Sequence, residues 1–189
     1  MAKTSRVLSP DPASAADPAA ERAAVTVVGI GNEFRGDDAV GLMVMRQLKE
    51  RVPAGVRTFE LTGDQTYLLE LMRSTDAVVM VDAVRSSAPA GTIFRVDASE
   101  ESVPKEFLSF STHAIDSAAA IELARTLGSL PRRVLIYGIV GKEFSFSTTM
   151  TAEVREAIEM VQDRILSDIE CILSEENTGK RGDCSGNKS

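Results

Sequence analysis

The sequence predicts an α/β fold in which a mixed, twisted five-stranded sheet lies between two layers of helices. First, short apolar, β-branched segments alternate with segments of helical apolar spacing along most of the chain. Second, Ala77–Val81 is apolar throughout, which is typical of a strand buried on both faces. Third, only residues 83–90 separate Asp82 from Gly91, too few for the crossover between parallel strands. The fourth strand should therefore be antiparallel to the third.

The first half of the chain contains two strands and two helices before this buried strand. Ala24–Ile30 is a β-branched apolar run and forms the first strand. A glycine turn leads into a helix from about Asp38 to Arg51, which a proline and a glycine end. Val56–Leu61 is the second strand, and Gln65–Arg73 carries the apolar spacing of a helix.

The second half adds two strands and two helices. Gly91–Val96 is the fourth strand and Arg133–Val140 the fifth, and the helix Ala114–Leu127 lies between them. Because helices join the remaining strands, those strands should be parallel to one another. The chain closes with a long helix from Met150 to about Ser174, and a capping arrangement marks its start: Thr148 or Thr149, with Glu153.

One domain is expected, flanked by two tails. Residues 1–21 are rich in Ala, Pro, Ser and Asp and are predicted to be disordered. Residues 22–175 form the single folded domain, and residues 176–189 are a polar, flexible tail. No apolar run reaches the roughly 18 residues of a membrane-spanning helix. No hydrophobic segment follows Lys3 and Arg6, so a secretory signal is not expected.

Charge and cysteine content limit the partners and the compartment. The formal net charge is -7 and the sequence pI is near 4.9, which argues against nucleic acid or an anionic membrane as the main partner. The two cysteines are Cys171 and Cys184. We expect them to be free thiols in a cytoplasmic protein.

Two carboxylates and the only imidazole should meet at one edge of the sheet. Asp38 follows the first strand, and Asp82 ends the third strand at the same carboxyl edge. His113 starts the helix before the fifth strand, and a helix that leads into a parallel strand begins at that edge. Such a set suits a divalent ion such as Zn, Ni, Mn or Fe, and it leaves coordination positions open for water or substrate.

Each of these residues also has a plain structural interpretation. Asp38 could cap its helix, Asp82 could be a turn residue, and His113 could be a partly exposed surface group. Asp37 is interpreted as a solvated acid in preference to a support for Asp38. The other polar neighbours have weaker interpretations: Glu33 and Arg35 as loop surface, Asp64 as cleft lining or helix cap, and Asp116 as a stabiliser of its helix start.

The glycine turn after the first strand does not match a nucleotide site. The third glycine of a dinucleotide fingerprint would fall at Phe34, and the chain contains no Walker-type loop. It also contains no G-x-S-x-G elbow and no Cys–His nucleophile pattern. Gly29–Asn32 is therefore interpreted as a tight turn that folds the aspartate loop across the sheet edge, and no cofactor-binding residues are assigned.

Three motifs resemble those of the hydrogenase maturation endopeptidases: GIGNEFRGDDAVG, VVMVDAV and STHAIDSA. The resemblance covers roughly Val25–Ile172 and implies a three-layer α/β/α domain of the phosphorylase/hydrolase-like kind. It implies that Asp38, Asp82 and His113 bind the metal. It also implies the substrate, which is the nickel-loaded large-subunit precursor of a [NiFe]-hydrogenase. The enzyme would remove the C-terminal extension of that precursor.

The resemblance further implies that nickel is supplied by the precursor, so that the enzyme itself can be metal-free. The expected partner is this precursor, and we expect a monomer with neither nucleic-acid nor membrane partners. The sequence leaves open whether the metal polarises the scissile carbonyl or activates water, or whether a carboxylate acts as the base. Two other functions stay open: a self-contained metal-dependent hydrolase, and a non-proteolytic maturation factor that binds nickel or the precursor.

Overall fold

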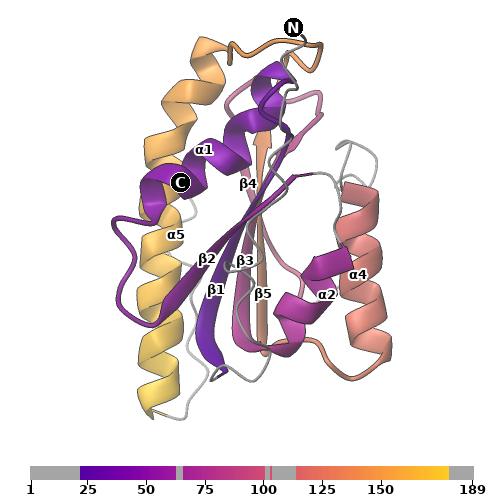
Figure 1. Ribbon diagram of the computed structural model, residues 1–189. Helices are drawn as coiled ribbons and strands as arrows, with labels where there is room; N and C mark the ends of the chain where they lie inside the picture. The colour runs from indigo at the N-terminus through magenta and orange to yellow at the C-terminus, as the bar shows by residue number, and fades with distance from the viewer. Residues whose placement is uncertain (1–21, 63–65, 101–102, 104–113, 179–189) are drawn as a thin grey trace, which may run out of the picture.

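The computed structural model describes residues 22–62, 66–100, 103 and 114–178. The two expected tails lie almost entirely outside these residues. The elements and their order are shown in Figure 1: β1 (Ala23–Ile30), the short 3-10 helix η2 (Gly36–Ala39), α1 (Val40–Leu48), β2 (Val56–Leu61), α2 (Thr66–Arg73), β3 (Thr75–Val84), β4 (Ile93–Asp97), α4 (Ala114–Thr126), β5 (Arg133–Val140) and α5 (Ala152–Thr178).

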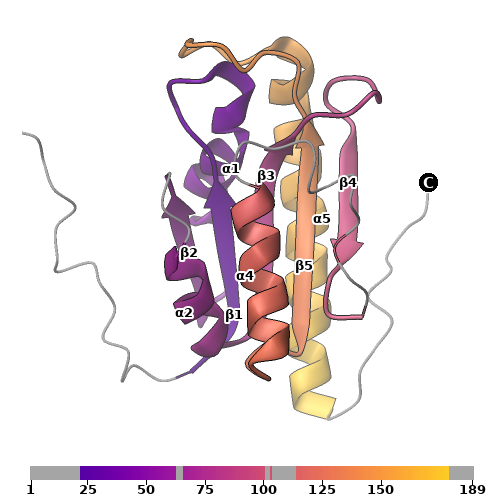
Figure 2. The same cartoon turned by 90° about the vertical axis from the view of Figure 1, so that its right-hand side faces the viewer.

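The five strands form one mixed sheet in the order β2-β1-β3-β5-β4. Pairing is parallel throughout except between β4 and β5, which are antiparallel. The predicted reversal of the fourth strand is therefore confirmed, and Figure 2 shows the β4 arrow opposed to that of β5. The short connection after β3 does not form a hairpin, because β5 lies between β3 and β4 in the sheet.

Helices cover both faces of the sheet, which confirms the predicted three-layer architecture. In Figure 1, α1 and α5 lie on one side, and α2 and α4 lie on the other. Alternate residues of β3 divide between two apolar cores. Val79 and Val81 pack with α1 and α5, whereas Val78 and Met80 pack with α2 and α4. By the two-residue period of a strand, Asp82 belongs to the face that α2 and α4 cover.

Three predicted element boundaries are wrong by a few residues: the end of β3, the start of β4 and the end of α1. β3 extends to Val84, because it stays paired with β5 up to Val140. β4 begins at Ile93 instead of Gly91, whose φ of 82° places it in a turn. α1 ends at Leu48, before the predicted Arg51.

The start of the last helix also differs from the prediction. α5 begins at Ala152, so Thr151 precedes it and neither Thr148 nor Thr149 caps it. The backbone N–H of Thr149 instead donates to the Ser147 hydroxyl, at 3.0 Å. At its other end α5 continues past Ser174, and the buried Glu175 lies 2.9 Å from Arg133.

Cys171 is disulfide-bonded, so the expectation that it is a free thiol is wrong. The other cysteine of the sequence, Cys184, lies outside the described residues. The sequence could not reveal this bond, because residue type and spacing do not distinguish a bonded from a free cysteine. None of the described helices is both long and apolar enough to span a membrane.

Candidate metal-binding edge

Two predicted site residues, Asp38 and Asp82, lie at the carboxyl edge of the parallel strands. Asp38 belongs to η2, six residues after the turn that ends β1, and its side chain is fully buried. Asp82 belongs to β3, two residues before the strand ends, and is 6% exposed. Because β1 and β3 are parallel neighbours, the two segments meet at the same edge. The structure therefore brings together the parts of the chain that carry these two carboxylates.

Glycines allow this close approach. A β-carbon at Gly41 would lie 2.2 Å from the carbonyl oxygen of Ile30 and 2.5 Å from that of Val81. A β-carbon at Gly31 would lie 2.0 Å from the carbonyl oxygen of Asp38. A real β-carbon cannot come this close to a backbone oxygen. Both positions must therefore be glycine for η2 and α1 to lie against the strand ends. Close packing at this edge thus requires a glycine in α1, Gly41, in addition to the predicted glycine turn.

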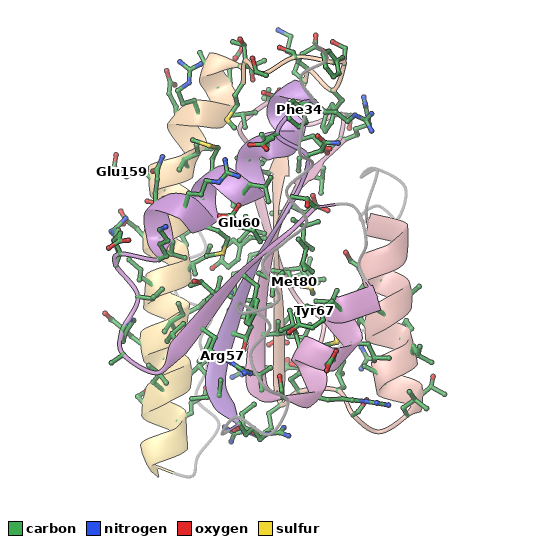
Figure 3. All side chains as sticks on the ribbon, in the orientation of Figure 1. Phe34, Arg57, Glu60, Tyr67, Met80 and Glu159 are labelled. Atoms are coloured by element: carbon green, nitrogen blue, oxygen red, sulfur yellow. The ribbon has the colours of Figure 1, made fainter. Side chains whose placement is uncertain are left out.

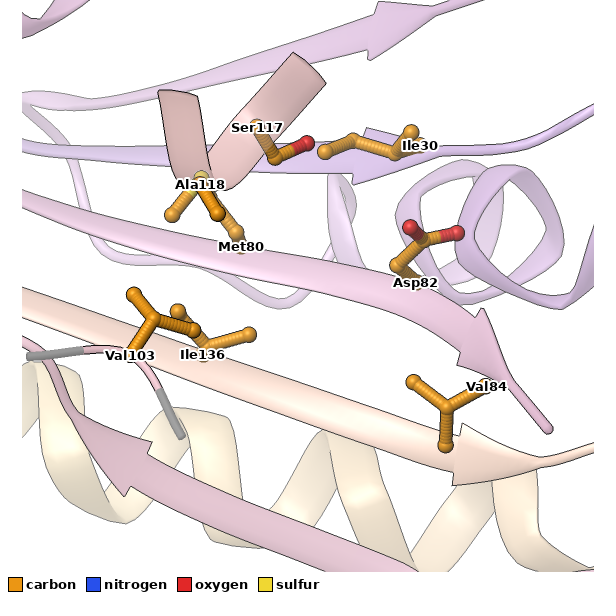
Figure 4. A pocket seen from close by; sticks show the side chains of 8 residues that line it. All are labelled: Ile30, Met80, Asp82, Val84, Val103, Ser117, Ala118 and Ile136. Atoms are coloured by element: carbon orange, nitrogen blue, oxygen red, sulfur yellow. The ribbon is translucent and has the colours of Figure 1, made fainter. Parts of the chain in front are cut away.

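Asp82 faces a small cavity between the sheet and α4, shown in Figure 4. The cavity has a volume of about 30 Å³, enough for a water molecule or an ion. One carboxylate oxygen of Asp82 accepts a hydrogen bond from the backbone N–H of Ala83, at 2.8 Å. Ser117 brings its hydroxyl from the first turns of α4, and the remaining lining is apolar: Ile30, Met80, Val84, Val103, Ala118 and Ile136. The carboxylate is therefore the main ionic group of this cavity among the described residues.

The third predicted ligand, His113, lies outside the described residues, as do Asp64 and the side chain of Asp116. α4 begins at Ala114, directly after His113 in sequence. Figure 2 shows that α4 runs opposite to β5, so its first turn lies at the carboxyl edge, as the topological argument requires. No cluster of three or more His, Cys, Asp or Glu side chains is arranged for a metal within the described part of the chain.

The plain structural interpretations of Asp38 and Asp82 do not hold. The positions that precede η2 and α1 are Arg35 and Ala39, and neither helix has a side-chain cap. Asp38 is therefore not a helix cap. Asp82 lies inside β3 and is not a turn residue. Both carboxylates are buried at the carboxyl edge of the sheet.

Asp37 is not the solvated acid that we predicted, because it is fully buried. One of its carboxylate oxygens accepts hydrogen bonds from the backbone N–H groups of Lys142 and Glu143, at 2.8 and 2.9 Å. The other accepts from the backbone N–H and the hydroxyl of Thr151, at 2.7 and 2.9 Å. Burial raises the pKa of Asp37, but the hydrogen bonds from Glu143, Lys142 and Thr151 outweigh it and bring the pKa below its ordinary value.

Glu33 and Arg35 are both predicted to lie on the loop surface, and only Glu33 does so fully. Glu33 is exposed and lies 3.3 Å from Arg46, which agrees with its prediction as loop surface. Arg35 is half-buried, and its guanidinium donates to the carbonyl oxygen of Phe144 at 3.3 Å. The segment 141–151 between β5 and α5 is thus a neighbour of the aspartate loop that the sequence did not indicate.

A larger groove of about 690 Å³ opens beside η2, on the side of α1 and α5. Phe34 stands at its rim, at the edge where α1 begins (Figure 3). The Phe34 ring is 52% exposed and stacks on Phe146, which is 87% exposed, with 6.4 Å between ring centres. Gly36 and Ala39 line the groove and flank the two aspartates of η2. Its size and the exposed Phe34 at its rim suit an extended peptide rather than a small ion.

Comparison with protein families gives one match over most of the domain. A family model described as hydrogenase maturation protease matches residues 42–168, which include Asp82 and His113. The chain is 28% identical over 140 residues to the hydrogenase expression/formation protein HupD of Thiocapsa roseopersicina. This alignment covers 71% of the chain but only 62% of that relative, less than two thirds of its length. The chain is also 25% identical to the hydrogenase 2 maturation protease of Escherichia coli, covering 76% of the chain and 88% of that protein.

Solved structures share the fold. The hydrogenase-maturating endopeptidase HybD from Escherichia coli superposes with a TM-score of 0.69, at 22% identity, over 82% of this chain and 94% of that one. An endopeptidase from Escherichia coli, solved in solution, gives a TM-score of 0.65 at 25% identity, over 81% of this chain and 93% of that one. The three-layer arrangement of one mixed sheet and its helices is common to them.

Proposed function

This chain belongs to the hydrogenase maturation protease family, and we propose that it removes the C-terminal extension of the large-subunit precursor of a [NiFe]-hydrogenase. It is a peptidase. The observation that carries the more specific proposal is the burial of Asp38 and Asp82 at one sheet edge. A groove of peptide size opens beside η2, the segment that carries Asp38. A metal-dependent peptidase needs ligands for the ion and a base for the attacking water, and carboxylates at this edge can serve as either.

We propose that Asp38, Asp82 and His113 complete the coordination of nickel that the precursor carries. The donor set supports this, because carboxylates with one imidazole suit a borderline divalent ion. When bound, nickel would supply Lewis-acid polarisation of a carbonyl or a water molecule. Because the substrate brings the metal, the enzyme needs no tight metal site of its own.

The chain's own residues would hold the precursor and orient the reacting groups. The exposed ring of Phe146 and the groove beside η2 would take the polypeptide that leads to the scissile bond. Asp38, from η2, and Asp82, from β3, would fix the metal-bearing part of the precursor, while burial in a low-dielectric edge strengthens each interaction. A carboxylate that is not engaged with the metal could accept the proton of the attacking water.

The test is the size of the large subunit after incubation of nickel-loaded precursor with purified enzyme. We expect Asp38→Asn, Asp82→Asn and His113→Gln to leave the precursor unprocessed. Asp76→Asn is the matched control, because Asp76 lies at the opposite end of the same strand as Asp82 and pairs with Arg22. Shortening of the large subunit by all three variants at the wild-type rate would refute the proposed site. Precursor that is bound but never shortened, even by the wild-type enzyme, would favour a non-proteolytic factor.

A further inference from the structure

The carboxylate of Asp37 joins two segments that are far apart in sequence. Its hydrogen-bond partners Lys142, Glu143 and Thr151 all belong to the segment 141–151, between β5 and α5. One carboxylate oxygen accepts hydrogen bonds from two backbone N–H groups. The other accepts from one backbone N–H and one hydroxyl. A buried carboxylate with this number of donors holds its partners in a defined geometry.

Backbone hydrogen bonds strengthen the same junction. The N–H of Asp37 donates to the carbonyl oxygen of Glu143 at 2.8 Å, and the N–H of Gly36 donates to that of Ser147 at 2.7 Å. The N–H of Ser147 donates in turn to the carbonyl oxygen of Phe34, at 2.9 Å. The turn that carries Asp38 is therefore fixed along its length to the segment 141–151.

The same segment is also attached to the end of β3, where Asp82 lies. The N–H of Gly141 donates to the carbonyl oxygen of Val84 at 2.9 Å. The guanidinium of Arg85 lies 3.9 Å from the centre of the Phe144 ring, within cation–π distance. One segment thus contacts both parts of the chain that carry the proposed nickel-binding carboxylates.

We infer that Asp37 is a positioning residue: by binding the segment 141–151 it holds Asp38 at a fixed place relative to Asp82. The inference rests on the proposed function of Asp38 and Asp82. Asp38 directly follows Asp37, so a rotation of η2 that breaks the Asp37 contacts also displaces the next carboxylate. Misplacement of about 1 Å can lower a rate roughly a hundredfold. Asp37 itself does not touch substrate, because its oxygens are directed at protein N–H and O–H groups.

Two substitutions test this from opposite sides of the contact. Asp37→Asn keeps the shape but replaces one acceptor oxygen with an N–H₂ group that faces N–H donors. Thr151→Val keeps the shape of Thr151 and removes only its hydroxyl donor, and Thr151→Ser restores that donor. Asp163→Asn is the matched control, because Asp163 is an exposed carboxylate that pairs with Arg51 on the surface. Asp38→Asn reports on the proposed function independently.

The readouts are kcat and KM for cleavage of nickel-loaded precursor, together with the thermal midpoint of each variant. We expect Asp37→Asn to lower kcat about a hundredfold and Thr151→Val about tenfold, with KM changed by less than about threefold. Thr151→Ser and Asp163→Asn should match the wild type. A purely structural role would lower the thermal midpoint but leave kcat per folded molecule unchanged.

The outcomes separate the two claims. Folded Asp37→Asn and Thr151→Val variants with wild-type kcat, beside an inactive Asp38→Asn, would overturn the positioning role while leaving the proposed function intact. A fully active Asp38→Asn would instead overturn the proposed role of Asp38, on which the inference rests. Should Asp37→Asn fail to fold, Thr151→Val and Thr151→Ser decide the question. Equal kcat in that pair would refute the inference, and loss with rescue would support it.

Discussion

Gly41 lies so close to Val81 that a β-carbon at position 41 would stand 2.5 Å from the Val81 carbonyl oxygen. Because of this contact, the first turn of α1 packs directly against β3 at Val81, the residue before Asp82. The same β-carbon would lie 2.2 Å from the carbonyl oxygen of Ile30, at the end of β1. Both obstacles are backbone atoms, which cannot move aside as a flexible side chain can.

Gly41→Ala should therefore destabilise the protein by about 2–3 kcal/mol through overpacking, measured as the free energy of unfolding in urea. Gly55→Ala is the control, because nothing lies within 4 Å of a β-carbon there and the cost comes only from its φ of 88°. That cost should be about 1 kcal/mol. Equal losses in the two variants would contradict the close-approach argument.

The proposed source of the metal predicts an unusual response to chelation. Enzyme that is treated with a chelator and then freed of it should still cleave nickel-loaded precursor, because the precursor brings the ion. Precursor made without nickel should remain uncleaved by the same enzyme. The measurement is the mass of the large subunit in the four combinations of treated or untreated enzyme with loaded or nickel-free precursor. If treated enzyme regains activity only when metal is added back to it, the chain is a self-contained metallohydrolase.

The sheet edge could be predicted from the sequence, because the signals for it are local. The apolar run Ala77–Val81 and the short connection after Asp82 are visible in the residues themselves. They placed the third strand and the reversal of the fourth, and with them the position of Asp82. Strand alternation then assigns Asp82 to the face of α2 and α4.

The environment of Asp37 could not be predicted in this way. Its partners are mostly backbone N–H groups, which every residue but proline carries, so no residue type marks them. The predicted cap of α5 is wrong for a related reason. Thr148 and Thr149 stand five and four residues before Glu153, whereas a capping box requires three. The hydroxyl near the helix start that forms a hydrogen bond belongs to Thr151, and its acceptor is Asp37. Only the folded chain brings that carboxylate there.

Arg95 and Asp168 form a two-pronged ion pair between β4 and α5, with N–O distances of 2.8 and 3.1 Å. The Asp168 side chain is 7% exposed. Arg95→Met should cost about 3 kcal/mol in the free energy of unfolding, because it leaves a buried carboxylate without its cation. Replacing both residues, Arg95→Met with Asp168→Leu, should cost less than the single change. A double variant that loses the sum of both single losses would show that the two side chains act independently.

The ionisation of Tyr137 should make the free energy of unfolding depend on pH in the alkaline range. Its buried hydroxyl donates to Asp168, and burial together with that carboxylate raises its pKa above the ordinary value of 10.0. The unfolded chain therefore loses this proton at lower pH than the folded chain does. The contribution of Tyr137 is fully present below pH 10, and it is lost as the pH rises above that value.

The variant Tyr137→Phe should start from lower stability, because Asp168 loses a hydrogen-bond donor. Its free energy of unfolding should then fall less steeply than that of the wild type as the pH rises above 10. Urea unfolding at a series of pH values, compared between the two proteins, measures the difference in slope. Tyr67→Phe is the matched control, since Tyr67 contacts Phe59 edge-on in the other core. Parallel slopes for wild type and Tyr137→Phe would disprove the assignment.

The junction at Asp37 also sets when the enzyme can become active during its synthesis. The partners of this carboxylate lie 105, 106 and 114 residues further along the chain. Contacts of such sequence separation form late, because the intervening loop must close before they are gained. A nascent chain on the ribosome can pair β1 with β3 well before Thr151 has emerged. The proposed site would thus be completed only after Thr151 has emerged, so a shorter nascent chain would not compete with mature enzyme for the precursor.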